Sequence, residues 1–143
     1  MAKVVAKMPE EFLLKISRLD KKTDEIIPRV LKAGGEVALE KVKSNLRSVI
    51  GRGTKYSSRS TGELLEALGL SPAKLDRDGN HNVKVGFAEP RKGGASNARI
   101  ANIVEHGKSG QPAKPFLAPA KTAARGPALE AMKAAFTREV GKL

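Results

Sequence analysis

Gly107-Lys108-Ser109 is the stretch that most resembles a chemical motif, because it matches the end of the phosphate-binding loop G-x-x-x-x-G-K-S/T. The glycines of that loop let backbone N–H groups surround phosphates. Here the first glycine would fall at position 102, which is Asn102, and no clear buried strand leads into the motif. The sequence therefore argues against nucleotide hydrolysis.

Histidine and acidic residues give no pattern typical of a catalytic or metal site. His81 and His106 are far apart and lack the H-E-x-x-H spacing of a zinc site. Glu105 precedes His106, but neighbouring residues on a helix point in different directions, which favours a capped helix end over an acid–base pair. No cysteine is present, so disulfides and thiolate ligands are excluded. We expect no catalytic residue, no cofactor and no metal, and hence no enzyme.

The excess of positive charge is the feature of the sequence that indicates which binding partners to expect. The formal net charge is +12, and acidic surfaces or nucleic acid are its natural counterparts. One stretch without any acid, from Gly51 to Gly62, carries Arg52, Lys55 and Arg59. Zinc-finger spacing and base-stacking aromatic strands are missing, so only non-specific contact with a nucleic acid backbone is indicated. Such a basic nucleic-acid-binding protein is the alternative function, and a solvated surface loop explains the three cations equally well.

The N-terminal third has the apolar spacing of long helices. Pro9-Glu10-Glu11 opens a helical pattern whose apolar face includes Leu13 and Ile16, and a second, longer pattern runs from Thr23 to Ile50. Pro28 lies near the start of the second pattern. Gly34-Gly35 predicts a close helix crossing, a bend, or a tolerated weak position.

The middle of the chain predicts loops around a small antiparallel sheet. Residues 51–60 and 90–97 are rich in Gly and Ser or Asn, which predicts two flexible loops. Between them we expect a short helix from Gly62 to Leu68, capped by Thr61. A turn from Asp76 to Asn82 should follow, then a strand from Val83 to Phe87 with Leu75 to Arg77 as its partner.

The last part of the chain predicts two further helices. Ile100, Ile103 and Val104 have helical spacing on a segment that should end at Gly107. A C-terminal helix follows from Ala120 to Leu143, which Pro127 kinks or restarts. The apolar stripe expected on it comprises Leu129, Met132, Ala135, Phe136 and Val140.

Together these elements predict one α+β domain over residues 1–143, because a chain of this length fits a single core. Aromatic residues make up only 3%, so some stability should come from contacts between subunits. No signal peptide or membrane span is indicated, which makes the cytosol the default compartment.

The most distinctive stretch combines two motifs. The first runs from Ala101 to Gly107 and the second from Gln111 to Ala120. They describe a helix stopped by glycine, a hairpin-like loop, and an extended segment stiffened by Pro112 and Pro115 before a last helix begins at Pro119. Proline fixes φ, so the segment suits either a surface presented to a neighbour or a rigid entry into the core.

This stretch resembles the head-to-tail joining, or tail-completion, family of long-tailed bacteriophages. In that family A-x-x-x-E-x-G is followed by P-A-R/K-P-F-L-x-P-A and a C-terminal helix, and a T-G-x-L element lies upstream, as in Thr61-Gly62-x-Leu64 here. The residues that match the longer pattern are Ala101, Glu105, Gly107, Pro112, Ala113, Lys114, Pro115, Phe116, Leu117, Pro119 and Ala120.

The resemblance implies a structural virion protein of the phage neck, made in the host cytoplasm and built into a homo-oligomeric ring between head and tail. Six copies are favoured over twelve, with neighbouring neck, connector and tail-tube proteins as partners. The Arg52 to Arg59 loop would reach a neighbour or DNA in the lumen. The subunit or partner interface would be built from Glu105, Gly107, Pro112, Lys114, Pro115 and Phe116.

Overall fold

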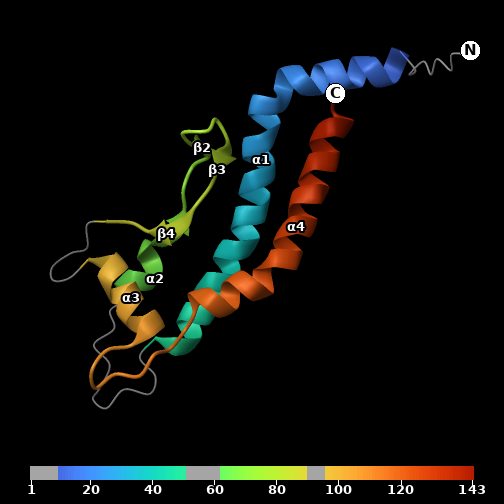
Figure 1. Cartoon of the computed structure of the whole chain (residues 1–143). Coiled ribbons are helices and arrows are strands. Elements are labelled where there is room, and N and C mark those ends of the chain that lie inside the picture. Colours follow the sequence, from blue (N-terminus) through green and yellow to red (C-terminus); the bar gives the residue numbers. More distant parts are fainter. Residues whose placement is uncertain (1–9, 51–61, 90–95) are drawn as a thin grey trace, which may run out of the picture.

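A computed structural model of the chain describes residues 10–50, 62–89 and 96–143. These residues form helices and short strands in an α+β arrangement, as predicted (Figure 1). The loop predicted at 51–60, the capping residue Thr61 and residues 90–95 of the second loop lie outside the described ranges. In chain order the elements are α1 (Glu10–Val49), α2 (Glu63–Ala67), β1 (Leu68–Leu70), β2 (Lys74–Leu75), β3 (His81–Asn82), β4 (Val85–Phe87), α3 (Asn97–His106) and α4 (Leu117–Gly141).

Helix α1 joins the two predicted N-terminal patterns into one continuous helix that contains Pro28. Figure 1 shows the blue N-terminal part of α1 turning away from the rest of the helix. Pro28 has no N–H to donate to the carbonyl of Asp24 and its ring crowds that turn, which accounts for a bend. One turn earlier the Thr23 hydroxyl donates to the carbonyl of Leu19 at 2.8 Å, a contact that also favours bending.

Helices α1 and α4 run antiparallel and side by side (Figure 1). Their backbones come close at Gly34, where an added Cβ would lie 2.5 Å from Cγ and 2.7 Å from Sδ of Met132. On the neighbouring side, a Cβ on Gly35 would lie 2.7 Å from Cδ1 of Leu70 in β1. The interpretation of Gly34-Gly35 as a close helix crossing is therefore confirmed.

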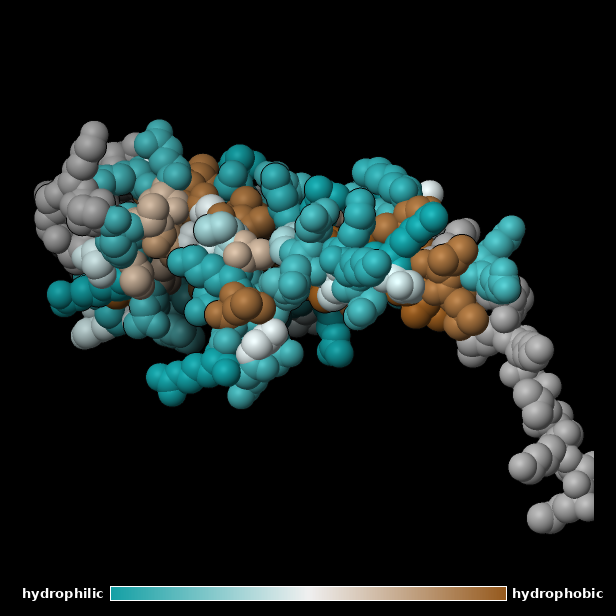
Figure 2. Space-filling model, turned by 90° about the horizontal axis from the view of Figure 1, so that it is seen from above, coloured by the Kyte–Doolittle hydropathy of each residue, from teal (hydrophilic) through white to brown (hydrophobic). Residues whose placement is uncertain are grey.

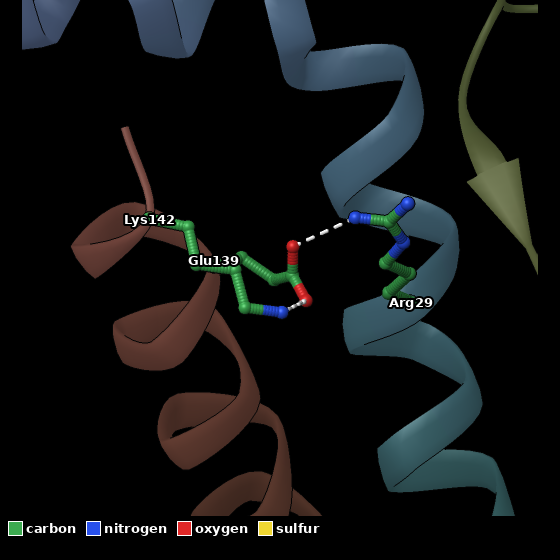
Figure 3. Close-up of polar contacts among 3 residues, drawn as sticks. All are labelled: Arg29, Glu139 and Lys142. Carbon is green, nitrogen blue, oxygen red and sulfur yellow. Dashed lines mark hydrogen bonds and ion pairs between the residues drawn. The ribbon is translucent and has the colours of Figure 1, made fainter.

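A polar contact closes the far end of the α1–α4 pair (Figure 3). The guanidinium of Arg29 on α1 donates to Oε2 of Glu139 at 2.8 Å, and Nζ of Lys142 donates to Oε1 at 3.2 Å. These two donors, Arg29 first, hold the pKa of the Glu139 carboxyl below its usual range.

The strands form one long antiparallel hairpin with a break in the middle. β1 pairs with β4, with Leu68 opposite Phe87, and β2 pairs with β3, with Leu75 opposite His81. The predicted partner of the Val83 to Phe87 strand was thus wrong, since Leu75 pairs across the turn and Leu68–Leu70 pairs with β4. Between the two ladders residues 71–73 face residues 83–84, which is the arrangement of a β-bulge.

Side chains hold both the bulge and the turn of this hairpin. At the bulge the Ser71 hydroxyl accepts the backbone N–H of Lys84 at 2.8 Å. At the turn, Oδ1 of Asp76 accepts the N–H groups of Asp78 and Asn80, each at 2.9 Å, and Gly79 has φ +78°. The predicted turn chemistry is confirmed.

The core lies where the base of the hairpin, α2, α3 and the start of α4 meet the second half of α1. Phe116 is completely buried, and its ring meets that of Phe87 edge to face with centroids 6.3 Å apart. The buried cluster around it comprises Val42, Leu46, Leu64, Leu68, Ala101 and Ala120. Farther along, the α1–α4 contact rests on small residues such as Ala124 and Ala135.

Several large apolar side chains have no place in this core. Leu129 and Phe136, from the apolar stripe predicted on the last helix, are 48% and 43% exposed, whereas Ala135 is buried. Leu13, Leu14 and Ile16, at the start of α1, are also exposed. Figure 2 shows a brown apolar patch beside the grey N-terminal trace. Among the described helices, none has the combination of length and apolarity that a bilayer span requires.

Candidate assembly interface at the α3–α4 loop

Helix α3 begins and ends with well-defined caps. The Ser96 hydroxyl accepts the N–H of Arg99 at 3.1 Å, so the helix starts at Asn97, the last residue of the predicted second loop. It ends at Gly107, as predicted, whose φ of +78° suits glycine. A Cβ there would also lie 2.7 Å from the backbone nitrogen of Ala113. Two independent constraints therefore require glycine at position 107.

The α3–α4 loop, residues 107–116, folds back on itself and is held at several points. Lys108 and Gln111 exchange backbone hydrogen bonds of 3.0 and 2.9 Å across a turn with Gly110 at φ +78°. The N–H of Lys114 donates to the carbonyl of Val104 at 2.8 Å. At the end of the loop, Nδ2 of Asn45 donates to the carbonyl of Phe116 at 3.2 Å. The predicted hairpin-like shape is confirmed.

Glu105 joins the end of α3 to the beginning of α4. Its Oε2 accepts the N–H groups of Phe116 at 2.7 Å and Leu117 at 2.8 Å, and its Oε1 accepts that of Ala118 at 3.0 Å. The first N–H groups of a helix have no partner within the helix, and Phe116, at the N-cap, offers no side-chain acceptor. One carboxylate thus caps α4 and lies at the positive end of its dipole.

Burial and hydrogen bonding act on the acidity of Glu105 in opposite directions. Burial alone raises the pKa of this carboxyl, since it disfavours the charged form. The three backbone donors outweigh burial, with a smaller contribution from His106, and the net pKa lies below its ordinary value. Glu105 is therefore a buried carboxylate that stays ionised near neutral pH.

The structure gathers the six predicted interface residues in and around this loop but exposes them unequally. Glu105 and Phe116 are buried inside the chain's own core, Gly107 and Lys114 are half-buried, and Pro112 and Pro115 are exposed. Glu105 and Phe116 can thus affect a neighbour only by holding the loop in place. The predicted basic residues Arg52, Lys55 and Arg59 lie outside the described residues.

The stretch Gly107-Lys108-Ser109 has a different setting from a phosphate-binding loop. It follows helix α3 and leads into a turn, whereas the phosphate loop joins a strand to the start of a helix. His106 is exposed while Glu105 is buried, in agreement with the helix-end interpretation. His81 lies in β3, with Nε2 3.3 Å from Oδ1 of Asp24. Among the described residues, no cluster of three or more His, Asp or Glu could hold a metal.

Two asparagines that support this region were not found from the sequence. Asn97 is 2% exposed and its Nδ2 donates to the carbonyl of Ala88 at 2.7 Å, which ties α3 to the end of β4. Asn45 reaches the α3–α4 loop from α1. The pattern Ser96-Asn97 before an apolar run could have indicated the start of α3, but neither side-chain contact leaves a sequence signal.

The comparisons with known proteins give one match. Residues 10–107 match the family model HK97-gp10_like, described as "Bacteriophage HK97-gp10, putative tail-component". No curated protein and no solved structure matches the chain. The match covers α1 to α3 and ends at the glycine that stops α3.

Proposed function

The chain belongs to the HK97 gp10-like family of phage tail components, and from this premise we propose that it is a structural protein of the phage neck that joins head to tail. A tail component is part of the virion, and its role is structural. Within that role the proposal is specific: the chain completes the tail or connector by protein–protein contacts and carries out no catalysis. Assembly takes place in the host cytoplasm before the virion is released.

The proposed assembly is a homo-oligomeric ring, with six copies favoured over twelve. A ring forms when one surface of each copy binds a different surface of the next and the rotation closes. The exposed apolar side chains support self-association, because Leu13, Leu14 and Ile16 leave about half of their surface open to solvent. A core with few aromatic residues also gains from contacts between subunits.

The observation that carries the proposal is the rigid presentation of the α3–α4 loop. Glu105 fixes its far end, Gly107 fixes its near end, and the exposed Pro112 and Pro115 lie between them. A surface that is already ordered loses less conformational entropy on binding than a disordered one. We assign the exposed part of this loop to contact with a neighbouring copy or with a connector or tail-tube protein.

The loop with Arg52, Lys55 and Arg59 has the second role in the proposal. Its three cations would meet either an acidic surface on a neighbouring ring protein or the phosphates of DNA passing through the lumen. Replacing all three with Ser should block productive head–tail joining while the far-ultraviolet circular dichroism of the purified chain stays unchanged. Normal virion yield would remove this loop from the proposal.

A first test is the mass of the purified chain by light scattering, at low and high salt and with duplex DNA. The neck proposal predicts a ring that survives high salt and forms without DNA. A monomer that binds DNA only at low salt would instead support the alternative, a non-specific nucleic-acid-binding protein.

A second test addresses the loop surface in the phage that encodes the chain. Pro112→Asp with Pro115→Asp places charge on two exposed positions, so folding should be retained while head–tail joining is lost. The matched control is Pro72→Asp, at an exposed proline of the hairpin. If both variants give the virion yield of the unchanged phage, the α3–α4 loop makes no contact needed for assembly.

A further inference from the structure

Helix α4 carries two different surfaces on opposite sides. Leu129 and Phe136, both exposed, lie two turns apart and so share one side, here called the α4 stripe. Ala131, Ala134 and Arg138 line a groove next to α1. At about 100° per residue, these three positions lie about half a turn around the helix from the α4 stripe. One side thus projects large apolar side chains, and the other borders a hollow.

The groove between α1 and α4 suits such projecting side chains. It is open to solvent, has a volume of about 690 Å³, and its apolar lining consists of small side chains. Small lining residues leave room for the large side chains of a third helix, since packed layers place large residues opposite small ones. The lining residues are Ala33, Glu36, Val37 and Glu40 from α1, and Ala131, Ala134 and Arg138 from α4.

Charge distinguishes the two surfaces. Glu36 and Glu40 lie one turn apart on the α1 wall of the groove, and neither forms an ion pair within the described part of the chain. Arg138 contributes one positive charge from the α4 wall, so the groove is acidic by one unit. In a chain of net charge +12, an acidic groove is a local exception.

The α4 stripe is bordered by the opposite charge. Arg125 and Lys133 are each four residues from Leu129, one turn before and one turn after it, and both are exposed. Lys133 contacts Glu130 at 3.6 Å, but both side chains are more than 70% exposed and so remain free to exchange partners. The α4 stripe therefore combines large apolar side chains with a basic border.

We infer that the groove receives the α4 stripe of a second copy of this chain, with Arg125 and Lys133 of one copy beside Glu36 and Glu40 of the next. The large side chains of the stripe match the small lining residues of the groove, and the basic border of the stripe matches the acidic groove. The groove and the α4 stripe lie on opposite sides of α4. Each copy can therefore bind the next copy through its groove and the previous copy through its α4 stripe, which is the head-to-tail contact that a ring requires. The inference rests on the proposed ring and specifies which surfaces close it.

Two charge-reversal variants test the contact. Glu36→Lys with Glu40→Lys makes the groove basic, and Arg125→Glu with Lys133→Glu makes the border of the α4 stripe acidic. Each variant alone should stay monomeric in light scattering, because its groove and its α4 stripe then repel. In an equimolar mixture every unlike pair regains opposite charges, so rings with an even number of copies should form again, with the two variants alternating.

Controls use the same charge changes on exposed residues elsewhere. Glu66→Lys with Asp78→Lys, and Lys74→Glu with Arg77→Glu, should each assemble alone as the unchanged chain does. If the unchanged chain forms rings and both groove and stripe variants also form them alone, the inference is overturned and the ring stands. If neither the unchanged chain nor the mixture assembles, the inference and the proposed ring are overturned together.

Discussion

The buried carboxylate of Glu105 accepts three backbone N–H groups at the start of α4, so its charge is linked to the stability of the fold. Its pKa is lowered in the folded state, so the unfolded chain binds the proton more tightly. The stabilisation is present above the ordinary pKa of a glutamate and is lost as the pH falls through the folded value.

Replacing this carboxylate should give a pH-dependent loss of stability. Glu105→Gln should lower the free energy of unfolding at pH 7 by roughly 1.5–3 kcal/mol, the range for hydrogen bonds to a charged group. The difference from the unchanged chain should narrow as the pH falls from the ordinary pKa of a glutamate through the lowered pKa of Glu105 in the folded chain. Urea unfolding between pH 3 and pH 7 measures it.

Glu130→Gln is the matched control for this prediction, since Glu130 also lies on α4 but its side chain is 76% exposed. It should change little at any pH. If the difference in unfolding free energy between the Glu105→Gln variant and the unchanged chain stays constant over the whole pH range, the packing of the Glu105 side chain, and not its charge, stabilises the start of α4.

Gly34 lies where the backbones of α1 and α4 come closest. Gly34→Ala places a Cβ against the middle of the Met132 side chain, and the overpacking should cost about 1–3 kcal/mol of unfolding free energy. Combined with Met132→Ala the cost should be smaller than the sum of the two single changes. Gly141→Ala, with nothing within 4 Å of its added Cβ, should be close to neutral. Additive single changes in denaturant unfolding would contradict the close crossing.

For individual residues the sequence predicted some roles and missed others. Gly107 as a helix stop follows from local backbone chemistry. For Gly34-Gly35 the sequence left a crossing, a bend and a weak position open, because a helix crossing depends on residues far away in the chain. The three hydrogen bonds of Glu105 join residues more than ten positions apart and could not be read from spacing. One signal was available: α4 begins without a Ser, Thr, Asp or Asn at its N-cap, so another group had to supply the acceptor.

Helix α1 is one element with two environments. Its second half contributes Val42 and Leu46 to the core, whereas the residues before the Pro28 bend expose Leu13, Leu14 and Ile16. An isolated helical segment of a few turns is marginal in water, because its stability depends on tertiary packing.

Hydrogen exchange should separate these two halves. In a dilute monomeric sample the amides of residues 10–19 should exchange much faster than those of residues 38–46, because local opening needs no loss of core contacts. The measurement is deuterium uptake by mass spectrometry over seconds to hours. Equal protection of both halves would mean that the first half has a partner in solution.

Helix periodicity predicted where the helices lie better than it predicted which elements pack against them. The helical patterns before Ile50 and after Pro119 were found, although α1 proved continuous and α4 begins two residues earlier, at Leu117. The strand Leu68–Leu70 was missed, because three residues directly after a helix show no alternation. Leu129 and Phe136 were expected in one apolar stripe, but their exposure could not be predicted, because periodicity shows which residues share a side of a helix and not what covers that side.

The family match ends at residue 107, but the core of the molecule does not. Phe116, Ala120 and Ala124 come from the loop and helix that follow, and Phe116 is fully buried. A chain cut after Gly110 keeps the whole matched region and should still fail to unfold cooperatively on heating, because it loses these core residues and the donors of Glu105. Calorimetry measures this.

A chain cut after Gly141 is the control and should unfold in a single transition close to that of the complete chain. Cooperative unfolding of residues 1–110 alone would mean that α4 is added to a domain that is already stable.

The pairing of the first long helix with the last has a consequence for biosynthesis. Arg29 contacts Glu139, 110 positions later in the chain. At translation rates of about 5–20 residues per second, α1 leaves the ribosome roughly 5–20 seconds before its partner helix exists. During that interval its apolar side is open to chaperones, and to the nascent chains of neighbouring ribosomes on the same message.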